Sequence, residues 1–179
     1  MVTTVSTENL DFNKVWLMFK ETDKKFQETD KIIRNLTKKM SEVESRWGKF
    51  VESLVEGSLV RILNEFGITV NRTSTREKCL FDDDEYEIDI IAKNGDEIVA
   101  VEVKTTLSVS DVKDFIAKLE LFKKAFPDYK KNKLFGAVAF IQKDSEADKF
   151  AAKSGLIVIK AVGESAKIAN RKDFKPKSW

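Results

Sequence analysis

Two carboxylates and a lysine on neighbouring stretches of alternating hydrophobicity form the group best suited to chemistry in this sequence. Asp89 lies in the first stretch, and Glu102 and Lys104 lie in the second. The Asn94-Gly95 pair between the stretches predicts a hairpin with a two-residue turn, which makes Asp89 and Glu102 diagonal neighbours on one face of a sheet. We therefore expect both carboxylates to reach one ion, with Lys104 beside them.

The residue types decide which ion this group would hold. The chain contains no His and a single Cys, Cys79, which excludes Ser-His-Asp and Cys-His triads, His-ligated zinc and internal disulfides. Two close carboxylates repel each other unless a cation compensates their charge, and oxygen ligands alone indicate a hard cation, Mg²⁺ or Mn²⁺. The alternative is a plain cross-strand salt bridge on a solvated face, but the interleaved Val101 and Val103 favour a buried position that needs a purpose.

The elements that must position this group predict an α/β fold with a mixed sheet flanked by helices in the order αβββαβαβ. A change of apolar period at Gly67 marks the end of the first helix. The two-residue turn pairs Ile91 with Ile98 and puts Ile88 and Ile90 on one core face. The predicted elements are a helix over 46–66, strands over 68–75, 85–93 and 96–104, a helix over 108–126, a strand over 134–142, a helix over 145–154 and a strand over 156–162, with an acidic loop over 78–84.

A heptad repeat precedes the sheet and predicts a long coiled-coil helix. Its charge pattern favours a parallel assembly, because g-to-e pairing then matches Lys25 with Asp30 and Lys39 with Glu44. Thr and Phe in the seam leave dimer and tetramer open, and an amphipathic helix packed on its own domain is the alternative. The seam positions are Phe12, Val15, Phe19, Thr22, Phe26, Thr29, Ile33, Leu36, Met40, Val43, Trp47, Phe50 and Leu54.

The segments Glu87-Ile-Asp89-Ile-Ile and Val101-Glu102-Val103-Lys104, between an acidic helix and a second helix, resemble the PD-(D/E)xK nuclease superfamily over roughly residues 46–162. The resemblance implies a restriction-endonuclease-like fold and an Mg²⁺- or Mn²⁺-dependent deoxyribonuclease. It implies that Asp89 and Glu102 hold the metal, that Lys104 positions or activates the attacking water, and that a Glu of the first helix completes the site. Counting back from the end of that helix assigns this last role to Glu56, with Glu52 as a second candidate.

These patterns divide the chain into four segments. We expect a disordered N-terminus over 1–11, a coiled-coil oligomerisation helix over 12–45, the nuclease-like domain over 46–163 and a basic C-terminal tail over 164–179.

Charge and hydropathy indicate the partners. The net charge of +2 excludes a uniformly basic coat, but residues 120–133 carry +3 and residues 160–179 carry +4, and each patch either neutralises phosphates or is ordinary surface. No apolar run has the length of a membrane span, so we expect a cytoplasmic protein without a membrane partner. The resemblance implies DNA as a partner, and the heptads predict further copies of the chain as partners. The alternative function is a non-catalytic coiled-coil scaffold or nucleic-acid-binding protein with a nuclease-like domain.

Overall fold

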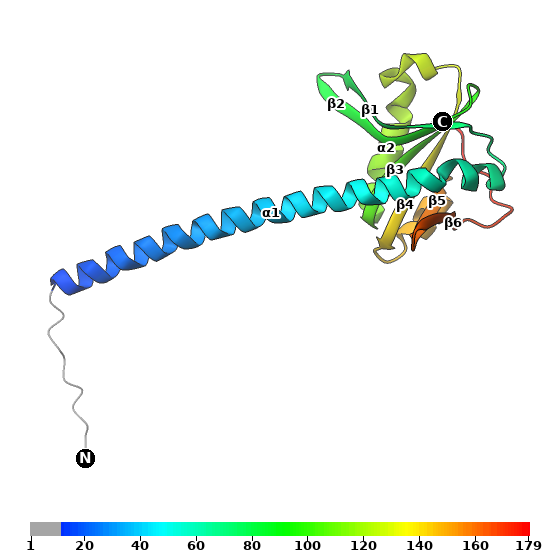
Figure 1. The fold of residues 1–179 in the computed structure, drawn as a ribbon. Helices are drawn as coiled ribbons and strands as arrows, with labels where there is room; N and C mark the ends of the chain where they lie inside the picture. The colour runs from blue at the N-terminus through cyan, green and yellow to red at the C-terminus, as the bar shows by residue number, and fades with distance from the viewer. Residues whose placement is uncertain (1–11) are drawn as a thin grey trace. The chain divides into compact units, whose positions relative to one another are not determined.

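The computed structural model describes residues 12–179 and has an α/β fold around one six-stranded mixed sheet (Figure 1). This confirms the predicted α/β class with a mixed sheet, and the predicted disordered segment 1–11 lies outside the described residues. The elements are α1 (Phe12–Phe66), β1 (Arg72–Phe81), β2 (Asp84–Lys93), β3 (Glu97–Leu107), α2 (Val109–Ala125), η1 (Pro127–Tyr129), β4 (Lys133–Lys143), α3 (Ala147–Lys153), β5 (Ile157–Val162) and β6 (Ser165–Ile168). No helix of this part of the chain is long and apolar enough to cross a bilayer.

The strands follow one another across the sheet in chain order. Antiparallel pairs join β1, β2 and β3, and parallel pairs join β3, β4 and β5 through α2 and α3. Strand β6 closes the sheet as an antiparallel edge. The carboxyl ends of β3, β4 and β5 therefore meet at the same edge, where open α/β sheets commonly bind ligands.

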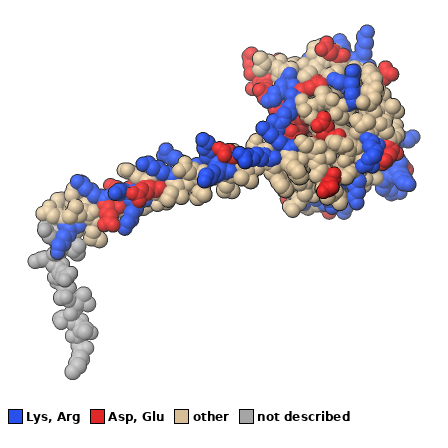
Figure 2. Space-filling view, viewed as in Figure 1, with Lys and Arg blue, Asp and Glu red and all other residues tan. Residues whose placement is uncertain are grey.

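The chain divides into two units between Ser45 and Arg46, and α1 contributes to both. In the first unit the apolar heptad positions other than the partly buried Val15 are exposed in the single chain, including Phe19 and Phe26 at 63% and 66%. The hydroxyls of Thr22 and Thr29 donate to carbonyl oxygens one turn earlier in the helix, so these seam residues present satisfied polar atoms. Charged side chains of both signs are spread over both units (Figure 2).

The second unit has a hydrophobic core on each face of its sheet. Val51, Val55 and Leu59 of α1 pack against one face, and α2 and α3 pack against the other. Figure 1 shows the end of α1 in front of the sheet and α2 behind it. Helix α1 stops at Gly67, whose φ of 96° lies in the left-handed region that glycine adopts without strain.

The β1–β2 hairpin differs from the sequence prediction. The loop predicted over 78–84 is wrong, because β1 continues to Phe81 and β2 begins at Asp84. The turn residues Asp82 and Asp83 have φ values of 52° and 67°, as a tight hairpin turn requires at both central positions. Asp tolerates this conformation better than most residues, so the acidic pair serves as the turn.

The β2–β3 register also needs correction. The structure pairs Ile91 with Ala100 instead of Ile98, a shift of two residues. The side chain of Asn94 accepts the N–H groups of Asp96 and Glu97 at 2.9 and 2.8 Å, which holds a longer loop than a two-residue turn. Because the shift is even, the predicted faces of β3 are retained.

The C-terminal segment contributes to the sheet. The prediction of a separate basic tail over 164–179 is therefore wrong. Ser165–Ile168 forms β6, and the last residues return to the sheet. There the N–H of Trp179 donates to the carbonyl of Leu134 at 2.9 Å, and the side chain of Lys123 donates to the carbonyl of Trp179 at 2.7 Å.

Candidate functional site

Asp89 lies where β2 loses its pairing with both neighbours. The β2–β3 register ends at the pair Ile90 and Val101, and the β1–β2 register skips the pair that Asp89 would form with Arg76. Here the backbone N–H of Val103 donates to Oδ2 of Asp89 at 2.7 Å, so a carboxylate takes the place of a strand carbonyl. The local distortion fixes this carboxylate beside β3.

The same distortion overturns one predicted core face. Ile88 packs in the core on the α2 side, whereas Ile90 packs in the core on the α1 side. In a regular strand these two residues would share a face. The alternation of side chains between the two faces of the sheet is therefore interrupted at Asp89. The structure contradicts the prediction of one common face for Ile88 and Ile90.

Glu102 is buried and is held by two lysines. Its side chain is 7% exposed, with Nζ of Lys104 at 3.0 Å and Nζ of Lys118 at 3.2 Å. Lys104 comes from the same strand, and Lys118 comes from α2. Gly136 permits this approach of α2, because a Cβ at that position would lie only 2.3 Å from Cδ1 of Leu119. The sequence analysis missed Lys118, although it immediately precedes an apolar position of the α2 stripe.

The electrostatics couple the predicted residues. Burial, and next the negative charge of Glu102, raise the pKa of Asp89 to about 6, although the N–H of Val103 acts in the opposite direction. Burial lowers the pKa of Lys104, but the charge and hydrogen bond of Glu102 outweigh it, so the net shift is upward. Asp89, Glu102 and Lys104 therefore form one electrostatic group.

Glu52 is the helix carboxylate that interacts electrostatically with this group. The charge of Glu52 contributes to the raised pKa of Asp89, whereas Glu56 accepts a 2.9 Å hydrogen bond from the hydroxyl of Thr73. Arg76 donates two 3.0 Å hydrogen bonds to Glu52, and its φ of 55° is unusual for a residue other than glycine. The sequence analysis missed Arg76, which has no signal in the hydropathy pattern.

The donor set fits a hard divalent cation in part. Within residues 12–179, no group of three or more acidic or Cys side chains is close enough to form a ready metal site, so the trio Glu56, Asp89 and Glu102 is not assembled. Each carboxylate already has a partner in the chain. Two coupled carboxylates are nevertheless sufficient for Mg²⁺, which commonly binds through one or two carboxylates plus waters and substrate phosphates. Asp89 and Glu102 would hold the ion, with Glu52 as the helix carboxylate whose charge acts on Asp89.

Other polar residues near this group in the chain have structural contacts. Glu87 forms a 2.9 Å ion pair with Lys78 across the β1–β2 hairpin, which fits an edge charge. Thr105 and Thr106 lie within β3, and Ser108 instead caps α2 by accepting the N–H of Asp111 at 3.1 Å.

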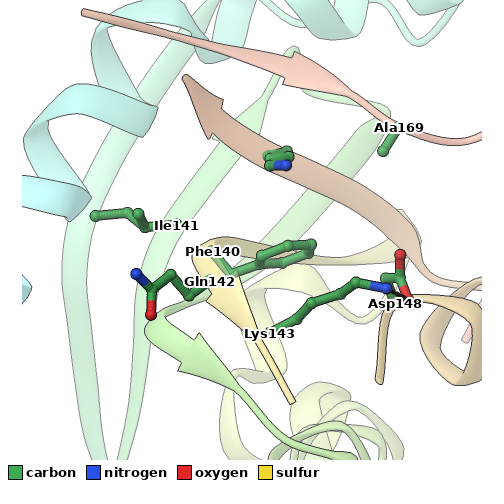
Figure 3. Close-up of a pocket in the computed structure, with 7 residues that line it drawn as sticks. Phe140, Ile141, Gln142, Lys143, Asp148 and Ala169 are labelled. Carbon is green, nitrogen blue, oxygen red and sulfur yellow. Dashed lines mark hydrogen bonds and ion pairs between the residues drawn. The ribbon is translucent and has the colours of Figure 1, made fainter. Parts of the chain in front are cut away.

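A separate pocket lies on β4 and β5 near their carboxyl ends (Figure 3). Its lining includes Phe140, Gln142, Lys143 and Lys160. The side chain of Lys143 extends to Asp148 of α3, with Nζ 2.5 Å from the carboxylate (Figure 3). Phe140 pairs with Lys104 in the β3–β4 register, so this pocket borders the strand that carries the candidate site.

The raised pKa of Asp89 predicts a pH dependence of stability. The folded state holds this proton more tightly than an unfolded chain with a pKa near 3.9, so the free energy of unfolding should fall by up to about 3 kcal/mol as pH rises from about 4 to 7. Asp89→Asn keeps an acceptor for the N–H of Val103 and should lack this slope. Urea unfolding of both proteins across this pH range, with chelator present, measures the difference. Parallel curves would contradict the burial of an ionising carboxylate at this position.

Comparison with known proteins yields two family matches and one structural neighbour. Residues 56–168 match a family described as "Domain of unknown function (DUF8196)", and residues 10–79 match one described as "Protein of unknown function (DUF3782)". No curated protein matches the chain. A solved structure described as "Crystal Structure of Protein of Unknown Function AF1548" is similar at 20% identity with a TM-score of 0.41, over 57% of this chain. The chain spans 54% of that protein, about half of its length.

Proposed function

The chain belongs to the family described as Domain of unknown function (DUF8196), and from its carboxylate-lysine group we propose that it is a metal-dependent nuclease that hydrolyses phosphodiester bonds of DNA. The proposal includes a restriction-endonuclease-like arrangement of the sheet. The observation that carries it is the coupling of Asp89 to the buried Glu102, with Lys104 at 3.0 Å from Glu102. Buried charges without a structural need for them are costly, which favours a chemical role.

The chain's own residues have distinct roles in this proposal. Asp89 and Glu102 would hold Mg²⁺ or Mn²⁺, which would supply polarisation of the phosphate and activation of water. Lys104 donates to the charge that develops on the phosphate or orients the attacking water. Lys118 positions Glu102 from the opposite side. Glu52, held by Arg76, replaces Glu56 as the helix carboxylate that we favour.

A non-catalytic nucleic-acid-binding scaffold is the second candidate function. It is favoured by one observation: the acidic side chains already have partners, with Glu102 bound by two lysines and Glu52 by Arg76. In that case the lysines would stabilise the fold and no metal would enter.

Incubation of the full chain with DNA separates these two candidates. Supercoiled plasmid and linear single- and double-stranded DNA are each incubated with Mn²⁺, with Mg²⁺ or with chelator. The nuclease proposal expects cleavage that appears with metal and disappears with chelator. Binding without cleavage under every metal condition would favour the scaffold and overturn the nuclease.

We further propose that the heptad face of α1 joins copies of this chain in a parallel coiled coil. The apolar seam residues Phe26, Ile33 and Met40 are more than half exposed in the single chain, which is costly unless a partner covers them. The g-to-e matches of the sequence supply charge complementarity for a parallel pair. Lys25 also pairs with Glu21 of its own helix at 2.9 Å. In the assembly its ammonium group would therefore be shared between this Glu21 and Asp30 of the other helix.

Removal of the seam is expected to reduce the size of the assembly without unfolding the sheet. A chain starting at Ser45 keeps the complete second unit and should elute and scatter light as a smaller particle than the full chain. A cysteine introduced at the exposed Lys14, in a Cys79→Ser background, should cross-link between copies if the helices are parallel. A monomeric full chain, or the absence of this cross-link in an oligomer, would contradict the parallel seam.

A further inference from the structure

A row of lysines crosses the sheet at the level of Lys104. The β3–β4 register pairs Lys104 with Phe140, the β4–β5 register pairs Phe140 with Lys160, and the β5–β6 register pairs Lys160 with Lys167. Residues paired in register share one face of a sheet. Phe140 belongs to the core on the α2 and α3 side, so all three lysines lie on that face together with Glu102.

Two lysines of this row lie directly opposite each other on neighbouring strands. Lys160 and Lys167 are exposed and paired across β5 and β6, and like charges at directly opposite positions destabilise a sheet. Within residues 12–179, neither lysine is within 4.0 Å of a carboxylate. Asp148 lines the same pocket as Lys160, but Lys143 already neutralises it at 2.5 Å. Among the described residues, Lys160 and Lys167 therefore present positive charge that no acidic side chain compensates, whereas Lys104 is paired with Glu102 at 3.0 Å.

The other basic patch of the sequence lies at the opposite end of the strands. Lys133 begins β4 seven residues before Phe140, which places it about 23 Å from the lysine row at about 3.3 Å per residue. Two of its members have structural contacts, because Lys133 pairs with Glu97 at 3.5 Å and Lys123 donates to the carbonyl of Trp179. Position in the sheet thus separates two patches that the sequence leaves equal.

We propose that Lys104, Lys160 and Lys167 form a track for the phosphate backbone of one nucleic-acid strand, which runs from the candidate site over β4, β5 and β6. This inference rests on the proposed nuclease function, because Lys104 belongs to both. Three strand spacings of about 4.8 Å give a row of about 14 Å, which a few consecutive phosphates of one strand can span. The ligand class is a polynucleotide, recognised through its phosphates and not through its bases.

Salt-dependent DNA binding tests the track without relying on cleavage. A fluorescent 20-base-pair duplex is titrated with the full chain in chelator, and the affinity is measured by anisotropy over a range of salt concentrations. The variant Lys160→Ala/Lys167→Ala should reduce the slope of log affinity against log salt by about 1.8, since each phosphate contact contributes about 0.9. The matched variant Lys130→Ala/Lys131→Ala removes the same charge from two exposed lysines and should keep the wild-type slope.

The outcomes distinguish the two proposals. A wild-type slope in Lys160→Ala/Lys167→Ala overturns the track, and if plasmid cleavage with Mn²⁺ persists, the nuclease proposal stands without it. No DNA binding by the wild-type chain overturns the track together with the proposed function. The thermal unfolding midpoint of Lys160→Ala/Lys167→Ala should equal or exceed that of wild type, because a repelling pair is removed. Should this variant unfold, the conservative Lys160→Gln/Lys167→Gln must show the same loss of slope for the track to be retained.

Discussion

An Asp89→Asn variant is expected to lose metal-dependent DNA cleavage by about a thousand-fold or more while its fold becomes more stable at neutral pH. Loss of a metal-holding carboxylate removes transition-state stabilisation of several kcal/mol, and about 4 kcal/mol corresponds to a thousand-fold in rate. The gain in stability arises because burial and Glu102 disfavour the charge of Asp89, whose pKa is raised to about 6. An asparagine retains an acceptor for the N–H of Val103.

The measurement pairs initial cleavage rates with Mn²⁺ and urea unfolding at pH 7.5. Asp96→Asn is the matched control, because Asp96 is an exposed carboxylate in the neighbouring loop and should keep both wild-type rate and stability. Wild-type cleavage by Asp89→Asn would remove Asp89 from the site.

Glu102→Gln should lose cleavage to a similar degree but with the opposite effect on stability. The sequence alone suggests that neutralising either carboxylate relieves repulsion and leaves the fold intact or slightly more stable. The structure changes this expectation for Glu102, because its buried carboxylate compensates Lys104 at 3.0 Å and Lys118 at 3.2 Å. Removing one partner of a buried ion pair is destabilising. The contrast in stability between the two variants is therefore a direct test of the geometry.

Lys104→Ala is expected to reduce turnover by two or more orders of magnitude and to weaken DNA binding only a few-fold. Loss of one positioned donor to a developing charge typically costs 10²- to 10³-fold in rate, whereas binding loses one phosphate contact among several. Lys118→Ala is the matched control, since it removes the other lysine that contacts Glu102. The charge of Lys104 acts on Asp89 as well as on Glu102, so Lys118→Ala should lose less activity than Lys104→Ala.

Single-turnover rates and anisotropy on the same DNA separate the two effects. Equal losses of rate and binding in Lys104→Ala would identify this lysine as a phosphate anchor of the track. Equal losses of rate in Lys104→Ala and Lys118→Ala would mean that both act only by holding Glu102.

Local pattern was sufficient for much of the fold. The heptad period predicted the helix through residues 12–54, and Gly67 predicted its end after Phe66, because both signals depend on residues within a turn or two of one another. Alternating hydrophobicity identified β2 and β3 and put Glu102 and Lys104 on one face. The two-residue shift in register left that face unchanged, because side-chain direction depends only on parity.

The sequence by itself determined which residues we propose for the chemistry, namely Asp89, Glu102 and Lys104, because their types and alternation are local properties. Only the tertiary structure decided their partners. Lys118 reaches Glu102 because Gly136 lets α2 approach the sheet, and Arg76 reaches Glu52 from the strand beside β2. It also decided that Lys160 and Lys167 continue the row of Lys104, through pairings with β4 and an edge strand that the sequence did not signal. Contacts between segments far apart in the chain depend on packing and register, and no periodicity within one segment records them.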